Sequence, residues 1–148
     1  MDKQGRFSLA LCVGLLAAVL FLLGTSAQAQ SGVSYVAPGG LCGGAAPCYA
    51  SIQDAVGAAR EGDTVKVAEG SYTRLDLQVL YLNKGITVIG GYSTTDWETS
   101  LPATRPTVLD AGDVVGRRGI LVENDSDVPV WVEGLVVQRG YAGPTADG

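Results

Sequence analysis

Val65-Lys66-Val67 followed by Gly70 is the first of four similar units that decide the predicted fold of this chain. The others are Ile86-Thr87-Val88 with Gly91, Thr107-Val108-Leu109 with Gly112, and Leu135-Val136-Val137 with Gly140. The four glycines are 21, 21 and 28 residues apart, and a period of this size is typical of stacked repeat proteins. The spacing therefore predicts an all-β fold of stacked coils, a parallel β-helix.

In such a stack, residues one repeat apart lie above one another at about 4.8 Å. We therefore expect two interior rows: Val67, Val88, Leu109 and Val137 in one, and Val65, Ile86, Thr107 and Leu135 in the other. Thr107 is polar where its row favours an aliphatic side chain. The alternative fold is an antiparallel sandwich, but it predicts closely spaced hairpin turns and no long period.

One helix is predicted before the strands. Ser51 is a good N-cap, Asp54 follows three residues later, and Gly62 is a suitable stop. The apolar face of this helix consists of Ile52, Ala55, Val56 and Ala59. We expect the helix to cover the first open coil, so that residues 30–63 form an N-terminal cap and residues 64–148 form the first coils.

The first 29 residues have the order of a secretory signal peptide. Lys3 and Arg6 precede an apolar run at 9–23, and Ala27-Gln28-Ala29 supplies the small residues of a cleavage site. A membrane anchor is the alternative, but the run is short for a span of about 20 residues. We therefore predict cleavage after Ala29, a secreted or cell-surface location, and no membrane contact after cleavage.

Without this segment the chain keeps eight basic and fourteen acidic side chains, a formal charge of −6. This charge disfavours binding to nucleic acid and to anionic lipid surfaces. Cys42 and Cys48 are then the remaining cysteines, and an oxidising compartment predicts a disulfide between them. A zinc site is disfavoured because the chain contains no histidine and no second cysteine pair.

The segment at 92–106 is longer and more polar than its neighbours, and we interpret it as an excursion from one coil. Trp97 in this segment is a candidate platform for stacking against a sugar, together with Tyr92. The interpretation that we favour for Trp97 is that it covers the side of the coil.

The opening of the mature chain resembles that of secreted bacterial right-handed parallel β-helix proteins, the pectate-lyase-like and polymorphic outer-membrane-like superfamily. The resemblance rests on four stretches, Tyr35–Gly40, Cys42–Cys48, Ser51–Val56 and Glu61–Tyr72, and on two further units, Gly85–Tyr92 and Val132–Leu135. It covers nearly all of the mature chain and implies a right-handed β-helix. It is less specific for activity, because enzymes, adhesins and other surface proteins share this opening.

The enzymes of this fold that act on acidic polysaccharides resemble one another in their clustered acidic calcium ligands and a nearby Arg or Lys. The candidate ligands here are Asp110, Asp113, Asp125 and Asp127, and Arg117 and Arg118 lie close in sequence. Acidic turns also serve solubility, and the glycine-rich nonapeptide of calcium-binding β-rolls is missing, so we expect no cofactor and keep calcium as an alternative. We assign no catalytic residue, because the sequence has neither a histidine nor a G-x-S-x-G motif.

Two functions are compatible with these features. We expect a non-catalytic, exported scaffold that contacts polysaccharides or cell-surface glycans. The alternative is the N-terminal part of a polysaccharide lyase or glycoside hydrolase whose active coils lie beyond residue 148. In both cases we expect an incomplete stack, continued by downstream coils of the same protein, because the last strand-and-glycine unit is not followed by a recognisable cap.

Overall fold

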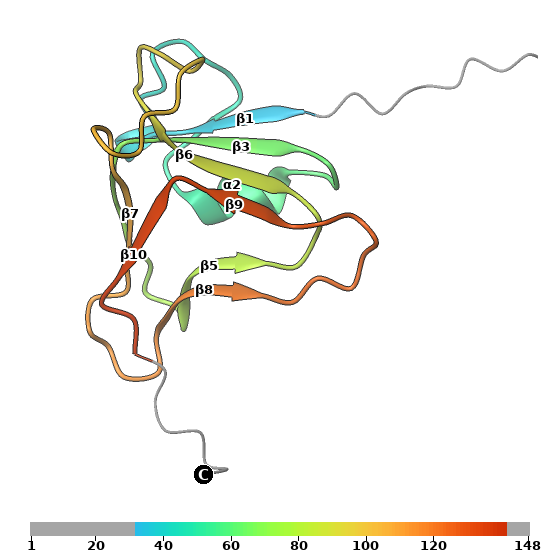
Figure 1. Ribbon diagram of the computed structural model, residues 1–148, viewed down its shortest axis with the longest axis vertical. Helices are drawn as coiled ribbons and strands as arrows, with labels where there is room; N and C mark the ends of the chain where they lie inside the picture. The colour runs from blue at the N-terminus through green and yellow to red at the C-terminus, as the bar shows by residue number, and fades with distance from the viewer. Residues whose placement is uncertain (1–31, 142–148) are drawn as a thin grey trace, which may run out of the picture. The chain divides into compact units, whose positions relative to one another are not determined.

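Ten short strands, one α-helix and one 3₁₀ turn make up residues 32–141, the part of the chain that the computed structural model describes (Figure 1). The predicted signal peptide lies outside these residues and stays a prediction. The elements in chain order are β1 (Val33–Val36), η1 (Pro38–Gly40), β2 (Cys48–Tyr49), α2 (Ile52–Ala58), β3 (Thr64–Ala68), β4 (Gly70–Tyr72), β5 (Gln78–Leu82), β6 (Thr87–Tyr92), β7 (Thr107–Asp110), β8 (Arg118–Val122), β9 (Trp131–Glu133) and β10 (Leu135–Gln138).

These strands form three sheets, and every pairing between them is parallel. Sheet A has the order β2-β1-β3-β6-β9, sheet B the order β10-β7-β4, and sheet C pairs β5 with β8. Each passage of the chain therefore places one strand in each sheet: β3, β4 and β5 first, then β6, β7 and β8. The prediction of a strand-rich fold with parallel pairing is confirmed, and the antiparallel sandwich is excluded.

The predicted interior rows are mostly wrong in register. Val88 pairs with Val65 rather than Val67, and Leu109 pairs with Tyr72 in sheet B rather than with Val88 in sheet A. Two pairings are as predicted, one in each row: Leu109 with Val137, and Thr107 with Leu135. The spacing of the four glycines misled because their units lie in two different sheets, β3 and β6 in sheet A and β7 and β10 in sheet B. An equal spacing in sequence therefore does not correspond to one step along the stack.

The core lies between the three sheets and α2. Its largest fully buried side chains are Leu80, Leu82, Ile86, Leu109, Val36, Val56, Val65, Val67, Val88 and Thr107. Thr107 is buried because its hydroxyl group is satisfied there: it accepts the Gly91 N–H at 2.9 Å and donates to the Ala68 carbonyl oxygen at 3.1 Å. A polar side chain in this row therefore joins strands of two sheets.

The helix forms where it was predicted. The Ser51 hydroxyl oxygen accepts the N–H of Asp54 at 3.4 Å, and all four residues of the predicted apolar face are buried. The helix ends at Ala58, before the predicted stop at Gly62, and Gly62 instead takes a positive φ of 82° in the turn that leads into β3.

At the N-terminal side, β3, β4 and β5, the strands of the first full passage through the three sheets, are each covered. β1 pairs with β3 in sheet A, and η1 lies against β4 in sheet B. In sheet C the side-chain amide of Gln53 from α2 bonds both main-chain groups of Tyr81: Nε2 donates to the carbonyl oxygen at 3.1 Å, and Oε1 accepts the N–H at 2.8 Å. Gln53 thus takes the place of a neighbouring strand.

The opposite side of the stack is open. Within residues 32–141 no strand pairs beyond β8, β9 or β10. Large apolar side chains on these strands are exposed: Val122, Trp131, Val132, Val136 and Val137. The structure therefore has one covered and one uncovered end. Among the described residues, no helix is long and apolar enough to span a membrane.

Candidate functional site

An aromatic cluster, which consists of Tyr35, Tyr92 and Trp97, lies beside sheet A. The ring centroids of Tyr35 and Trp97 are 5.0 Å apart with an interplanar angle of 67°, and those of Tyr92 and Trp97 are 5.9 Å apart. Lys66 reaches the same cluster: its ammonium group donates to the Trp97 carbonyl oxygen at 2.5 Å and lies 5.1 Å from the centroid of the Tyr92 ring. This cation–π contact and hydrogen bond fix the excursion to β3.

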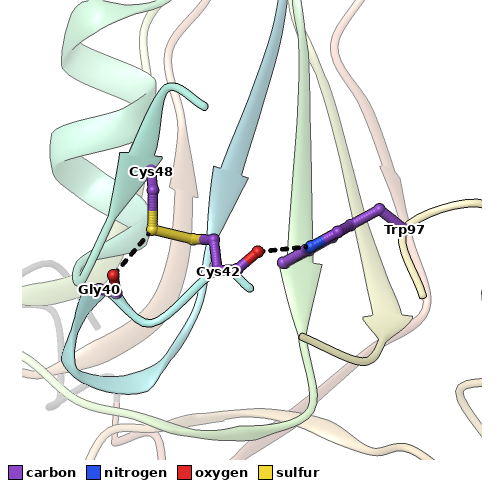
Figure 2. Close-up of a disulfide and its surroundings, with 4 residues drawn as sticks. All are labelled: Gly40, Cys42, Cys48 and Trp97. Atoms are coloured by element: carbon purple, nitrogen blue, oxygen red, sulfur yellow. Dashed lines mark hydrogen bonds between the residues drawn. A yellow bond between two sulfur atoms is a disulfide. The ribbon is translucent and has the colours of Figure 1, made fainter. Parts of the chain in front are cut away.

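A disulfide joins Cys42 and Cys48, as predicted, and its loop packs against the aromatic cluster (Figure 2). The indole Nε1 of Trp97 donates to the Cys42 carbonyl oxygen at 3.0 Å, and Cys48 Sγ lies 3.0 Å from the Gly40 carbonyl oxygen. Gly43 has a φ of +61°, and a Cβ atom there would lie 2.0 Å from the Thr94 carbonyl oxygen. The disulfide loop and the excursion therefore pack main chain against main chain.

This packing limits the surface that the two aromatic candidates offer to a sugar. Tyr92 is only 5% exposed, and its burial, followed by the charges of Glu133 and Glu98, raises the pKa of its phenol. Tyr92 therefore offers little surface to a sugar, because Trp97 of the excursion packs against it. Trp97 is half-buried and packs against a small buried group of residues, in agreement with the interpretation that it covers the side of the coil. Glycan contact at these rings stays a prediction.

Both carboxylate oxygens of Asp110, the first calcium candidate, accept hydrogen bonds from other groups of the protein. Arg139 donates to both of its oxygens, Gln138 Nε2 donates to Oδ2 at 3.1 Å, and the Gly112 N–H donates to Oδ1 at 2.9 Å. The bonds from Arg139, assisted by those from Gly112 and Gln138, hold the pKa of Asp110 at about 2 although its burial acts in the opposite direction. These donors occupy the directions that a cation would need.

The other three candidates lie apart from a common centre. Asp113 is exposed, and its Oδ2 lies 4.0 Å from Arg139 Nη1. Asp125 and Asp127 are exposed in the turn between β8 and β9, where the Asn124 Nδ2 group donates to the Val128 carbonyl oxygen at 2.8 Å. Within the described residues no three acidic, histidine or cysteine side chains gather as a metal site. The four aspartates are therefore not brought together.

A cavity of about 260 Å³ opens beside the N-terminal end of α2, between residues 51–53 and residues 71–74. Its polar groups are the side chains of Ser51, Gln53, Ser71, Thr73 and Arg74. Gln53 is already bonded to Tyr81, and Arg74 forms an ion pair with Asp76. The cavity contains none of the residues that were proposed from the sequence.

Sequence reasoning missed the residues that complete the Asp110 site. Gln138 pairs with Asp110 in the register of β10 and β7, and Arg139 follows it directly. The signal available in the sequence was the alignment of Thr107–Asp110 with Leu135–Gln138, which places a basic residue one step beyond an acidic one. Nothing in the sequence indicated the contact between Lys66 and Trp97, because Trp97 lies in an irregular segment.

No protein-family model matches this chain, and neither a curated protein nor a solved structure matches it. The resemblance to secreted β-helix proteins therefore stays a prediction, and the function has to be argued from the geometry.

Proposed function

We propose that this chain is the capped start of a right-handed parallel β-helix and serves as an exported, non-catalytic scaffold. The observation that carries the proposal is the asymmetry of the stack. β1, η1 and Gln53 cover β3, β4 and β5, one strand in each sheet, whereas within residues 32–141 the outer edges of β8, β9 and β10 are unpaired. A solenoid needs a cap at its start, and its open end accepts further strands, such as downstream coils of the same protein.

The chemistry of the charged groups supports a scaffold rather than an enzyme. A catalytic acid or base needs a free position next to a substrate. Asp110 instead receives bonds from Arg139, Gln138 and Gly112. Asp96 accepts from Arg105 Nη1 at 3.0 Å and from two N–H groups of its own turn, and the Arg105 bond is the main cause of its lowered pKa. Both carboxylates thus hold the chain together.

The proposed partners are polysaccharides or cell-surface glycans, contacted through the side of the stack near Trp97. The test is incubation of the purified chain with pectin, alginate and related polymers, with and without added calcium. We expect no release of unsaturated or reducing ends, while an authentic lyase run in parallel releases them. Calcium-dependent product formation that disappears in Asp110→Asn would overturn the scaffold proposal in favour of a lyase.

A further inference from the structure

Three turns lie above one another where the chain passes out of sheet B: residues 73–77 between β4 and β5, residues 111–117 between β7 and β8, and residues 139–141 after β10. Main-chain bonds join them in this order. Arg118 N–H donates to the Leu77 carbonyl oxygen at 2.8 Å, and Tyr141 N–H donates to the Arg117 carbonyl oxygen at 2.8 Å. The turn between β7 and β8 is visible below β7 in Figure 1.

The tips of these turns are apolar and strongly exposed. We call this set the apolar ridge: Leu75 (91% exposed), Leu77 (68%), Val114 (42%), Val115 (74%) and Tyr141 (48%). Single exposed apolar residues are ordinary, but a contiguous group of them marks an interaction surface. The ridge consists of turn residues, none of which belongs to β8, β9 or β10, the strands of the open end.

Arg117 holds the ridge in this exposed form. Its guanidinium group donates to three main-chain carbonyl oxygens: from Nε to Asp76 at 3.0 Å, from Nη1 to Ala111 at 3.2 Å and from Nη2 to Leu75 at 3.4 Å. One side chain therefore ties the first turn to the second. Because the main chain of both turns is fixed, their leucine and valine side chains project outward instead of folding back onto the coil.

The same turns carry an excess of positive charge in an otherwise acidic chain. Half of the eight basic residues that follow residue 29 lie in these turns or directly after one of them: Arg74, Arg117 and Arg139 in the turns, and Arg118 at the start of β8. Arg74 pairs with Asp76, and Arg139 pairs with Asp110 and approaches Asp113. Among residues 32–141, no carboxylate lies within ion-pair distance of Arg117 or Arg118. The Arg117 guanidinium is occupied by the three carbonyl oxygens, so Arg118, which is exposed, is the arginine available to a negatively charged partner.

We propose that the apolar ridge is a contact surface for an anionic lipid bilayer. Leu75, Leu77 and Val115 would enter the boundary between headgroups and acyl chains, with Arg118 close to the phosphates. Projecting tips suit a fluid surface that deforms around them, and a tyrosine such as Tyr141 favours the interface. The net negative charge of the chain opposes this contact only weakly, because charges more than about 10 Å away are largely screened.

A tryptophan at the tip of the ridge provides a local test. The Leu75→Trp variant of the full chain is mixed with vesicles of pure phosphatidylcholine, or with vesicles in which one lipid in four is phosphatidylglycerol. We expect its added fluorescence to shift to shorter wavelength with the anionic vesicles, and the shift to shrink at high salt. Leu41→Trp is the matched control, because Leu41 is 73% exposed but lies on the disulfide loop. We expect no shift there.

Two further variants identify the groups responsible. Leu75→Ser combined with Val115→Ser should reduce the fraction of protein that sediments with anionic vesicles several-fold, with an unchanged circular dichroism spectrum because both sites are exposed. Arg118→Glu should remove the preference for anionic over neutral vesicles. If the fluorescence of Leu75→Trp did not shift with anionic vesicles, or if that of Leu41→Trp shifted equally, the proposal would be overturned. Self-association without vesicles that the double serine variant abolishes would assign the ridge to a protein contact instead, and would leave the scaffold proposal untouched.

Discussion

At the scale of single residues, Asp110 is the group whose ionisation the fold favours most clearly. Hydrogen bonds from Arg139, Gly112 and Gln138 hold its pKa at about 2, below the ordinary value of 3.8. A carboxyl group whose folded pKa is depressed stabilises the protein above its unfolded pKa, and this stabilisation is lost as the pH falls toward the folded pKa. Asp110 should therefore contribute fully at neutral pH and progressively less below about pH 4.

We predict that Asp110→Asn lowers the free energy of unfolding at neutral pH, and that the difference from the wild type narrows as the pH is lowered toward 2. Urea titrations of both proteins across this range measure the difference directly. Asp113→Asn is the control, since Asp113 is exposed and lies 4.0 Å from the same arginine, and its effect should be small throughout. A difference for Asp110→Asn that stays constant with pH would contradict the assigned ion pair.

Thr107 provides a second prediction at this scale. Its hydroxyl group is the acceptor for the buried Gly91 N–H and a donor to the Ala68 carbonyl oxygen. Valine has nearly the same shape but leaves the N–H without its partner, so Thr107→Val should destabilise the fold by about 1–3 kcal/mol. Thr104→Val, at an exposed position in the excursion, should cost much less. Equal midpoints of thermal unfolding for the two variants would refute the role given to Thr107.

These residues also mark the limit of prediction from sequence. The alternation at Val65 and Val67 was enough to predict which side chains face inward, because the two faces of a strand differ at the next residue. The hydrogen bonds of the Thr107 hydroxyl group could not be predicted, since its partners Gly91 and Ala68 belong to neighbouring strands of another sheet. For the same reason Asp110 was kept as a candidate calcium ligand: its arginine partner can be identified only when the register of β7 and β10 is known.

At the scale of elements, α2 acts through the contact of Gln53 with the edge of β5. The side-chain amide satisfies the N–H and the carbonyl group of Tyr81 at once. We predict that Gln53→Ala lowers the stability by about 1 kcal/mol, the usual size of a net hydrogen-bond contribution. It should also increase the rate of hydrogen exchange at the Tyr81 amide, measured by NMR.

Gln53→Glu separates the two bonds, because a carboxylate accepts but cannot donate. It should keep the Tyr81 amide protected while it loses the bond to the carbonyl group, so its stability should fall between those of the wild type and Gln53→Ala. If the Tyr81 amide were equally protected in all three proteins, the edge of β5 would have to be covered by something other than Gln53.

Elements defined by local signals were predictable, and their spatial order was not. The cap at Ser51 and the helical spacing of the apolar residues lie within a dozen residues, so the start of the helix was predicted at its observed position, although the helix ends at Ala58 rather than at the predicted stop. The order of the strands depends on how much chain separates them. The excursion at 92–106 separates β6 from β7 and lengthens one passage, and β7 pairs with β4 in sheet B rather than with β6 in sheet A. A constant period in sequence cannot describe a stack with such an insertion.

At the scale of the whole molecule, the two ends of the stack differ in what holds them. Among the residues that the structure describes, β3 and β6 have a paired strand on both sides and bury their inward valines, whereas β9 and β10 have a neighbour on one side and expose most of their side chains. In a stacked protein each layer is stabilised mainly by the layers next to it. A layer with one neighbour should therefore open at a lower free energy than a layer with two.

We accordingly predict a gradient of hydrogen exchange along the stack. Under native conditions, peptides that cover β9 and β10 should exchange first, those of β6 and β7 later, and those of β3 last, when the exchange is followed by mass spectrometry. Exposure alone does not explain such an order, because β3 and β6 are both buried and differ only in distance from the open end. Val132→Lys should speed exchange in β9 and leave β3 unchanged. If β9 and β10 were protected as strongly as β3 in the isolated chain, another surface would have to be pairing with the end that we describe as open.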